Sequence, residues 1–217
     1  MNDVLLINPS GTAQMGFSNP PLGLLYIASA LEAEGISVDI IDGYISGDEA
    51  IHQALKRQYP FVGITCLTPA RHSAISVARL AKELSPDSVT VMGGVHPTVA
   101  AKQMREHYPF IDHVVEGDGE LKMVDIVKGQ DQRQDEVDVD KLPFPAWHKV
   151  DLRKYPARGR TKVDLGRFNG VWVGFEPRVS IEWSRSCSAH CNFCSSWWVK
   201  GRYRARDPYR MTDEIEQ

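Results

Sequence analysis

Long hydrophobic runs are absent from this 217-residue sequence. No stretch approaches the roughly 20 apolar residues that cross a bilayer, and residues 1–8 lack the basic start of a secretory signal. Cysteine is scarce too, because there are four in all and three of them fall within eight positions near the end. A secreted disulfide framework would spread paired cysteines along the chain. We therefore expect a cytoplasmic protein with no transmembrane segment.

Two nucleotide-binding signatures are also missing. The sequence contains neither the GxGxxG of dinucleotide-binding folds nor the GxxxxGK[ST] of P-loop proteins, which leaves a dinucleotide or nucleoside triphosphate site with little support. Its 42% hydrophobic and 24% charged residues are typical of a globular protein that buries a core. At this length we expect one full domain and part of a second.

Charge is unevenly divided along the chain. Residues 1–150 hold 12 Lys and Arg against 20 Asp and Glu, a balance of −8, whereas residues 151–217 hold 13 against 8, a balance of +5. The basic residues near the end alternate with tyrosines and an aspartate instead of forming a continuous run, so a nucleic-acid partner is disfavoured. Contacts to an anionic cofactor or substrate, or a solvated face, explain them as well.

The first 128 residues alternate short apolar runs with stretches of helical spacing. The runs have strand length and are rich in β-branched residues: Val4–Ile7, Val38–Ile41, Phe61–Thr65, Val89–Met92 and Ile111–Val115. Helical spacing marks 24–31 and 75–84, with helix ends near Gly35 and Pro86. This alternation predicts an α/β fold with a flavodoxin-like, doubly wound, five-stranded parallel sheet and helices on both faces.

The loops that follow these strands are rich in Gly, Pro and polar residues. In doubly wound sheets, ligands bind beyond the carboxyl ends of the strands, near the switch in strand order. Four such loops on one sheet edge favour a ligand site, although Gly and Pro also simply end strands and start helices. Glycine lets a backbone approach a ligand closely, and helix N-termini offer unpaired N–H donors. The candidate binding residues are Ser10, Thr65, Leu67, Thr68, Gly93, Gly94, His96, Glu116, Gly117, Asp118, Gly119 and Glu120.

Three segments resemble the cobalamin-binding domain that precedes many radical S-adenosylmethionine enzymes. They are residues 19–28 (Asn-Pro-Pro-Leu-Gly-Leu-Leu-Tyr-Ile-Ala), 93–98 (Gly-Gly-Val-His-Pro-Thr) and 116–120 (Glu-Gly-Asp-Gly-Glu). The resemblance covers about the first 145 residues. It implies that the loop residues named above bind cobalamin, with the corrin ring against the strand ends and the nucleotide tail between sheet and helices.

One departure from related domains concerns the cobalt ligand. Mutase-type cobalamin domains carry Asp-x-His-x-x-Gly after the first strand, whereas residues 10–16 contain no histidine. We therefore do not expect that loop to ligate the lower face of cobalt. His96 is a substitute candidate, but a histidine before proline at a strand-to-helix turn more often bonds the backbone. Cys66 is expected to be a buried strand-end thiol, with a place in the wall of the cobalamin site as the alternative.

A polar linker separates this domain from a cysteine cluster. Residues 129–141 contain almost no apolar side chain, and residues 142–147 match a segment that joins the two domains in the resembled family. We divide the chain into a cobalamin-binding-like domain at 1–128, a linker and connecting segment at 129–178, and the start of a second domain at 179–217. Residues 179–183 are predicted to form a strand, and a helix is predicted to begin near Thr212.

The second region carries Cys187, Cys191 and Cys194 in the spacing Cys-x3-Cys-x2-Cys. Three thiolates on one compact loop can hold three irons of a 4Fe-4S cluster and leave the fourth iron open for chemistry. Structural zinc is the main alternative, with His190, which lies between two of the cysteines, as the fourth ligand. A redox pair of Cys191 and Cys194 would leave Cys187 unexplained.

The cysteine motif closely resembles that of the radical S-adenosylmethionine superfamily. The resemblance implies that the open iron binds S-adenosylmethionine, that Phe193 lies beside its adenine, and that reductive cleavage yields a 5'-deoxyadenosyl radical. It also implies a partial (β/α) barrel, of which this chain holds only the start, and an electron donor such as ferredoxin or flavodoxin. The chain is therefore expected to be the N-terminal part of a larger enzyme.

Within the superfamily, a stretch of about thirty residues that includes Arg204-Ala-Arg-Asp-Pro most resembles the anaerobic magnesium-protoporphyrin monomethyl ester oxidative cyclases. The favoured hypothesis is oxidative cyclisation of a tetrapyrrole side chain, or a similar C–H functionalisation of a small molecule. Three alternatives remain open. They are C-methylation that uses methylcobalamin, a non-catalytic corrinoid or iron-sulfur module, and a zinc-bearing nucleic-acid binder.

Overall fold

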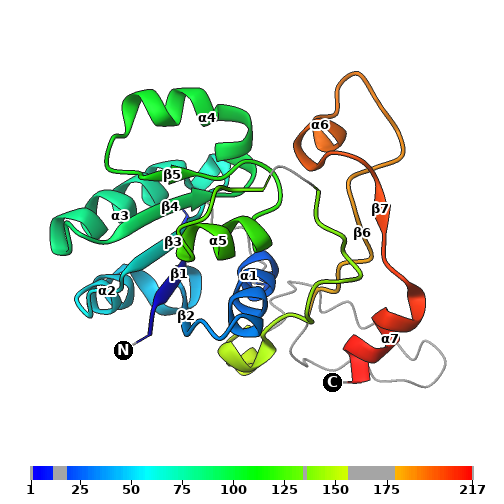
Figure 1. Cartoon of the computed structure of the whole chain (residues 1–217), viewed down its shortest axis with the longest axis horizontal. Coiled ribbons are helices and arrows are strands. Elements are labelled where there is room, and N and C mark those ends of the chain that lie inside the picture. Colours follow the sequence, from blue (N-terminus) through cyan, green and yellow to red (C-terminus); the bar gives the residue numbers. More distant parts are fainter. Residues whose placement is uncertain (1, 12–18, 134–135, 156–178, 217) are drawn as a thin grey trace, which may run out of the picture.

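The computed structural model describes residues 2–11, 19–133, 136–155 and 179–216. Five parallel strands form a sheet in the order β2-β1-β3-β4-β5 (Figure 1). This order confirms the predicted flavodoxin-like sheet, because β2 pairs with one side of β1 and β3 with the other, so the strand order reverses at β1. The strands are β1 (Val4–Asn8), β2 (Val38–Asp42), β3 (Phe61–Thr65), β4 (Val89–Gly93) and β5 (His113–Val114).

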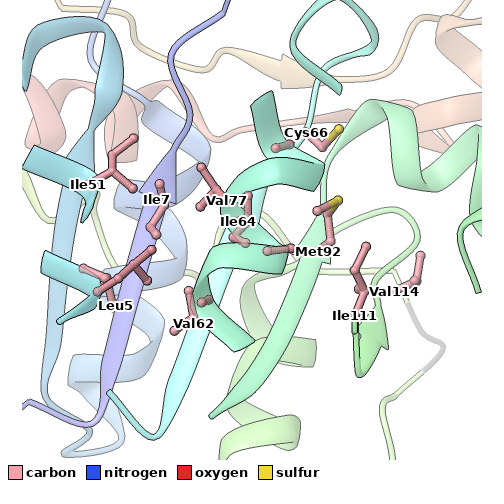
Figure 2. Close-up of a cluster of buried hydrophobic side chains, with 14 of the residues drawn as sticks. Leu5, Ile7, Ile51, Val62, Ile64, Cys66, Val77, Met92, Ile111 and Val114 are labelled. Atoms are coloured by element: carbon pink, nitrogen blue, oxygen red, sulfur yellow. The ribbon is translucent and has the colours of Figure 1, made fainter. Parts of the chain in front are cut away.

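Helices cover both faces of the sheet. Successive side chains of a strand point to opposite faces, so Leu5 and Ile7 of β1 pack in one core cluster while Val4 and Leu6 pack in the other. The first cluster, shown in Figure 2, lies under α2 (Gly43–Leu55), α3 (Arg71–Leu84) and α4 (Val95–His107). The second lies under α1 (Leu22–Ala33) and α5 (Glu120–Val127).

The helix ends follow the sequence signals. Helix α1 ends at Ala33, and Gly35, which follows the capping residue Glu34, takes a left-handed backbone with φ of 72°. Glycine adopts that conformation at little steric cost, which explains the stop. Helix α3 ends at Leu84, two residues before Pro86, because a proline disfavours helical backbone in the residue that precedes it.

The C-terminal region is built from short elements. Strands β6 (Ser184–Arg185) and β7 (Arg204–Ala205) form an antiparallel pair, followed by α7 (Pro208–Glu216), and α6 (Ser196–Lys200) lies between the two strands in sequence. These elements lie to one side of the sheet in Figure 1. The connecting segment carries two single-turn helices, η2 (Trp147–Lys149) and η3 (Leu152–Lys154). It is anchored on α1, since the amide of Ala146 donates to the carbonyl of Leu25 at 3.1 Å.

Two predictions for this region are wrong. The strand predicted at 179–183 is absent, because strand pairing begins only at Ser184, where β7 supplies a partner two residues long. The helix predicted to begin near Thr212 begins at Pro208. The Asp207 carboxylate caps it by accepting from the amides of Tyr209 at 2.8 Å and Arg210 at 3.2 Å. Proline suits the first position of a helix, so Asp207 prevails over Thr212 as the cap.

Strand β5 is shorter than its apolar run predicts. Asp112 lies within that run, and its carboxylate accepts a hydrogen bond of 2.7 Å from the amide of Thr90, the position where a longer β5 would pair with β4. The predicted linker at 129–178 lies partly outside the described residues. Within the described ranges, no helix has the length and apolar character needed to cross a membrane.

Candidate functional site

A cavity of about 310 Å³ lies between the sheet and the helix pair α1 and α5. Its floor is the sheet face formed by Leu6, Gly63 and Val91, which are in register on adjacent strands. Ile27 of α1 and Met123 of α5 line the opposite side. The cavity therefore opens where ligands bind in doubly wound sheets, at the carboxyl ends of the central strands.

Gly63 lets the side chains that line the cavity pack close to the sheet. It is the middle residue of β3, and a Cβ added there would stand 2.7 Å from Leu6 Cδ2 and 3.5 Å from Met123 Cε. The neighbouring residues of β3, Val62 and Ile64, are buried. An isolated glycine in an otherwise apolar strand marks a place where another group approaches the backbone closely, and here the side chains of Leu6 and Met123, which line the cavity, lie over the glycine.

The loops after β3 and β4 are joined by backbone hydrogen bonds at the mouth of the cavity. The amide of Cys66 donates to the carbonyl of Gly93 at 2.8 Å, and the amide of His96 donates to the carbonyl of Cys66 at 3.1 Å. Gly94 has φ of 107°, and a Cβ there would stand 3.0 Å from the carbonyl oxygen of Cys66. Only glycine fits this close crossing of two loops without strain, so bare backbone forms this wall of the cavity.

The structure gathers most of the predicted loop residues around the cavity. Those that line it are Thr65, Leu67, Gly93, Gly94, Gly117, Asp118, Gly119 and Glu120. The other four make contacts elsewhere. Ser10 donates to Asp48, Glu116 pairs with Arg105 at 2.6 Å, and Thr68 Oγ1 and His96 Nδ1 lie 3.2 Å apart.

Two side chains behind the strand ends were singled out from the sequence, Cys66 and His96. Cys66 is fully buried, which confirms the predicted strand-end thiol, and burial raises its pKa to about 11. Burial and the nearby Arg71 lower the pKa of His96. Its backbone bonds Cys66 and its ring contacts Thr68. A role for His96 as a cobalt ligand stays a prediction.

A buried group of charges closes one side of the cavity. Arg185 of β6 is 5% exposed and ion-pairs with Glu120 at 2.6 Å, Glu182 at 2.9 Å and Asp118 at 3.2 Å. Arg204 of β7 ion-pairs with the other oxygen of Asp118 at 2.6 Å. Glu120, Asp118, Glu182 and Arg185 all line the cavity.

The pKa shifts agree with this pairing. Burial favours the neutral form of Asp118, but Arg185 and Arg204 outweigh it and hold the pKa of that carboxyl below its ordinary value. Burial favours the neutral form of Arg185 too, yet Glu120, Glu182 and Asp118 raise its pKa. Both groups are therefore charged at neutral pH. One oxygen of this cluster, Glu120 Oε2, is buried and has no hydrogen-bond partner within the described residues.

The three clustered cysteines lie on the loop between β6 and α6. Cys187 and Cys191 are exposed, and Cys194 is half-buried. The amides of Ala189 and Ser196 lie 3.4 Å and 3.5 Å from the sulfurs of Cys187 and Cys194. Within the described ranges, no group of three or more His, Cys, Asp and Glu side chains is gathered as a metal site. The cluster assignment therefore stays a prediction, as does that of Phe193, which is 94% exposed.

Sequence reasoning missed two parts of the cavity. The first is its apolar interior, although the isolated Gly63 in a β-branched strand was a usable signal. The second is the contribution of the C-terminal region, which lines the cavity through Glu182, Arg185 and Lys200. No local pattern reveals that Arg185 pairs with a residue 65 positions earlier in the chain.

Comparison with known proteins identifies the fold. Residues 11–127 match the B12 binding domain family. Among solved structures, the radical S-adenosylmethionine methyltransferase TsrM from Kitasatospora setae, determined with cobalamin and a [4Fe-4S] cluster bound, covers the whole chain with a TM-score of 0.67 at 20% identity. The cobalamin-dependent S-adenosylmethionine radical enzyme OxsB covers 98% of the chain with a TM-score of 0.75 at 18% identity. The chain covers 46% and 31% of those two proteins.

Curated relatives align over nearly the whole chain. The anaerobic magnesium-protoporphyrin IX monomethyl ester cyclase of Rubrivivax gelatinosus is 33% identical over 98% of this chain, and an uncharacterized methyltransferase of Pyrococcus horikoshii is 32% identical over 99% of it. The chain spans 42% and 50% of the length of these two relatives. Together with the fold and the cavity at the strand ends, these matches show that the chain belongs to the B12-binding domain family and is homologous to the anaerobic magnesium-protoporphyrin IX monomethyl ester cyclases.

Proposed function

We propose that the cavity between the sheet and helices α1 and α5 binds the nucleotide tail of cobalamin. The observation that carries this proposal is the cavity lined by Leu6, Gly63 and Val91, which opens at the carboxyl ends of the central strands. A volume of about 310 Å³ suits a group the size of one aromatic base rather than a whole corrinoid. The corrin ring would therefore lie outside the cavity, over the loops after β3, β4 and β5.

The chain offers this cofactor a fitting set of contacts. Leu6, Val91 and Met123 supply apolar surface for the base, and the loops around Gly94 and Gly119 supply backbone without side chains. Glu120 Oε2 supplies a buried acceptor for a hydroxyl or amide donor of the ligand. Thr65, Leu67, Gly93, Gly117 and Asp118 complete the wall, with Ser10, Thr68, His96 and Glu116 further out along the same edge as candidates for the corrin side chains.

We propose further that Cys187, Cys191 and Cys194 hold a 4Fe-4S cluster beside which Phe193 receives S-adenosylmethionine. The similarity of the fold to TsrM and OxsB supports this assignment. When bound, such a cluster supplies one open iron for S-adenosylmethionine. In this arrangement, residues 1–128 are the cobalamin domain, 129–178 the connection, and 179–217 the first part of a radical S-adenosylmethionine domain that receives electrons from a ferredoxin or flavodoxin.

Two reactions on a small-molecule substrate are equally well supported by the relatives of this chain. Oxidative cyclisation of a tetrapyrrole side chain is supported by homology to the cyclase of Rubrivivax gelatinosus. Methyl transfer is supported by three other relatives, the methyltransferase of Pyrococcus horikoshii, the cytidylyl-2-hydroxyethylphosphonate methyltransferase of Streptomyces wedmorensis and the hopanoid C-3 methylase of Methylococcus capsulatus. The non-catalytic corrinoid or iron-sulfur module remains the alternative for the chain by itself.

Anaerobic reconstitution tests the cluster. Wild-type protein and a variant with all three of Cys187, Cys191 and Cys194 changed to Ala are treated with iron and sulfide, and iron, sulfide and zinc contents are measured with the EPR spectrum of the reduced protein. We expect about four irons only in the wild type, with an EPR signal that shifts on addition of S-adenosylmethionine. Bound zinc, or equal iron in both proteins, would refute the assignment.

Cobalamin binding tests the cavity. Replacing Gly63 with Val pushes the side chains of Leu6 and Met123 toward the cavity that they line. This change is expected to weaken binding of hydroxocobalamin by at least about tenfold, a loss near 1.4 kcal/mol. Val62 lies next to it on the same strand and points to the other core cluster, so Val62→Ile is the matched overpacking control. Equal dissociation constants for Gly63→Val and the control, measured by absorption titration, would refute the position of the site.

A further inference from the structure

The two regions of the chain meet through charged side chains at the cavity wall. The loop between β5 and α5 contributes Asp118, the start of α5 contributes Glu120, and the C-terminal region contributes Arg185 and Arg204. Asp118, Glu120 and Arg185 are all nearly inaccessible to solvent, with side-chain exposures of 10%, 6% and 5%. Buried charges require partners, and here each of these charges has at least one partner in the other region.

Arg185 is the centre of this contact. Its Nη2 donates to Glu120 Oε1 at 2.6 Å, its Nη1 lies 3.2 Å from Asp118 Oδ1, and its Nε donates to Glu182 at 2.9 Å. The guanidinium also lies 5.6 Å from the centre of the Tyr26 ring on α1. It therefore touches the β5–α5 loop, helix α1 and its own segment at once, only two residues before Cys187.

Glu120 connects Arg185 with the cavity. One carboxylate oxygen accepts from Arg185, while the other is buried, unpaired within the described residues, and belongs to a side chain that lines the cavity. A ligand that fills the cavity and Arg185 therefore act on the same carboxylate. The orientation that suits one bond fixes the direction of the other.

We propose that Arg185 is a positioning residue that couples the cavity to the cysteine loop, so that cobalamin binding and docking of residues 184–206 strengthen each other. This inference rests on the proposed cobalamin site. A ligand that immobilises Glu120 stabilises the docked arginine, and by linkage the docked arginine raises the affinity for the ligand by the same factor. The cysteine loop is thereby fixed beside the cavity mouth when the cavity is filled.

Equilibrium titration with hydroxocobalamin tests the coupling in the full chain. Arg185→Gln removes the charge and the fork of donors, Arg185→Lys keeps the charge, and Arg153→Gln is the matched control because Arg153 is exposed and pairs with Asp151 in the connecting segment. We expect the dissociation constant to rise roughly tenfold in Arg185→Gln, within the usual range of couplings between sites. Arg185→Lys should recover part of this loss, and Arg153→Gln should match the wild type.

Hydrogen exchange separates coupling from a purely structural role. We expect cobalamin to slow backbone exchange in residues 184–206 of the wild type and the control, and to leave it unchanged in Arg185→Gln. Two results would overturn the inference and leave the proposed cobalamin site in place. One is an unchanged dissociation constant in Arg185→Gln, and the other is backbone exchange in wild-type residues 184–206 that does not change when cobalamin is added. The wild-type measurement decides even where Arg185→Gln does not fold. No binding by the wild type would overturn the proposed cobalamin site and this inference together.

Discussion

The two regions of this chain are held together by different forces. In the five-stranded domain, strands β1 to β4 contribute side chains to both apolar clusters, and residues such as Leu5, Ile7 and Met92 are fully buried. The C-terminal region has two strands of two residues each, helices of five and nine residues, and large apolar side chains such as Trp183 and Tyr209 in solvent. Its buried residues are mainly charged, with Arg185, Arg206 and Glu214 among them.

This difference predicts two levels of stability. Apolar burial is the main stabilising term in folding, so the sheet domain should unfold as one cooperative unit. A small region held by ion pairs gains less, because desolvation of the charges offsets much of their attraction. The C-terminal region should therefore open locally at a lower free energy than the sheet unfolds. Weak docking of the C-terminal region is consistent with a cysteine loop whose position depends on ligand binding.

The largest expected effect comes from the sheet core. Leu5→Ala removes a buried side chain beneath α2 and α3 and should lower the free energy of unfolding by about 2–5 kcal/mol. Trp183→Ala removes a larger side chain that is 61% exposed and should change it by no more than about 0.5 kcal/mol. Urea unfolding followed by far-UV circular dichroism measures both. Similar losses for the two variants would mean that apolar burial in the sheet core does not dominate the stability of this chain.

Breaking the buried pair Arg206 and Glu214 should loosen the C-terminal region and leave the stability of the sheet domain unchanged. Their charged groups lie 2.5 Å apart, and Arg206 also donates to the hydroxyl of Tyr26 at 2.9 Å. Glu214→Ala leaves a buried guanidinium without its counter-charge, which typically costs about 3–5 kcal/mol. Because α7 can separate from the sheet domain without unfolding it, we expect this free-energy loss to appear as faster backbone hydrogen exchange in α7. The free energy of unfolding of the sheet domain should stay unchanged. Asp213→Ala, which changes an exposed neighbour, is the control and should leave exchange in α7 as it is.

Acid should release the C-terminal region through Asp118. The pKa of this carboxyl is lowered in the folded chain, so its stabilising contribution is present above the ordinary value of 3.8 and is lost as the pH falls below it. Hydrogen bonds to charged groups contribute about 1.5–3 kcal/mol each, and Asp118 receives one from Arg204. We expect Asp118→Asn to weaken docking of the C-terminal region at neutral pH and to make this docking less dependent on acid. Tryptophan fluorescence as a function of pH measures both effects.

A carboxylate in the sheet domain gives the matched control for this titration. Asp112 is also held below its ordinary pKa, against the effect of its burial, by Lys82 and Thr90. Asp112→Asn should therefore reduce the acid dependence of far-UV circular dichroism and leave that of tryptophan fluorescence unchanged. If both variants alter both signals alike, the two regions form one cooperative unit.

The same contrast explains what the sequence could predict of the fold. Strands β1 to β4 agree with their apolar runs to within one residue, because strands buried on both faces carry apolar side chains throughout. Strand β5 was overextended because Asp112 binds Thr90 across the sheet edge, which is a tertiary contact. The strand predicted at 179–183 and the helix start at Thr212 failed in the C-terminal region, where partners far along the chain decide the structure.

The candidate site divides in the same way. Gly93, Gly94, Gly117 and Gly119 could be placed at the strand ends from local patterns, and they line the cavity. Glu182, Arg185 and Lys200 could not, because a charged residue carries no local sign of the partner that it meets. Glu120 was named as a binding residue, but its ion pair with Arg185 follows only from the packing of two regions 65 residues apart in sequence.

Two residues with left-handed backbone give the smallest and most direct comparison. Gln58, after α2, has φ of 59°, and Ser186, beside Cys187, has φ of 68°. Glycine avoids the steric cost of this conformation but loses more chain entropy on folding, so relief of this strain should stabilise by about 0.5–1 kcal/mol. Gln58→Gly should therefore raise the free energy of sheet unfolding. Ser186 Oγ also donates to the carbonyl of Gly201 at 2.6 Å, and both Ser186→Ala and Ser186→Gly lose this bond, so Ser186→Ala, which keeps the strain, is the reference for Ser186→Gly. Relative to Ser186→Ala, Ser186→Gly should only slow exchange in residues 184–206. A gain in the free energy of sheet unfolding from Ser186→Gly over Ser186→Ala that equals the gain from Gln58→Gly would mean that the cysteine loop folds with the sheet and not onto it.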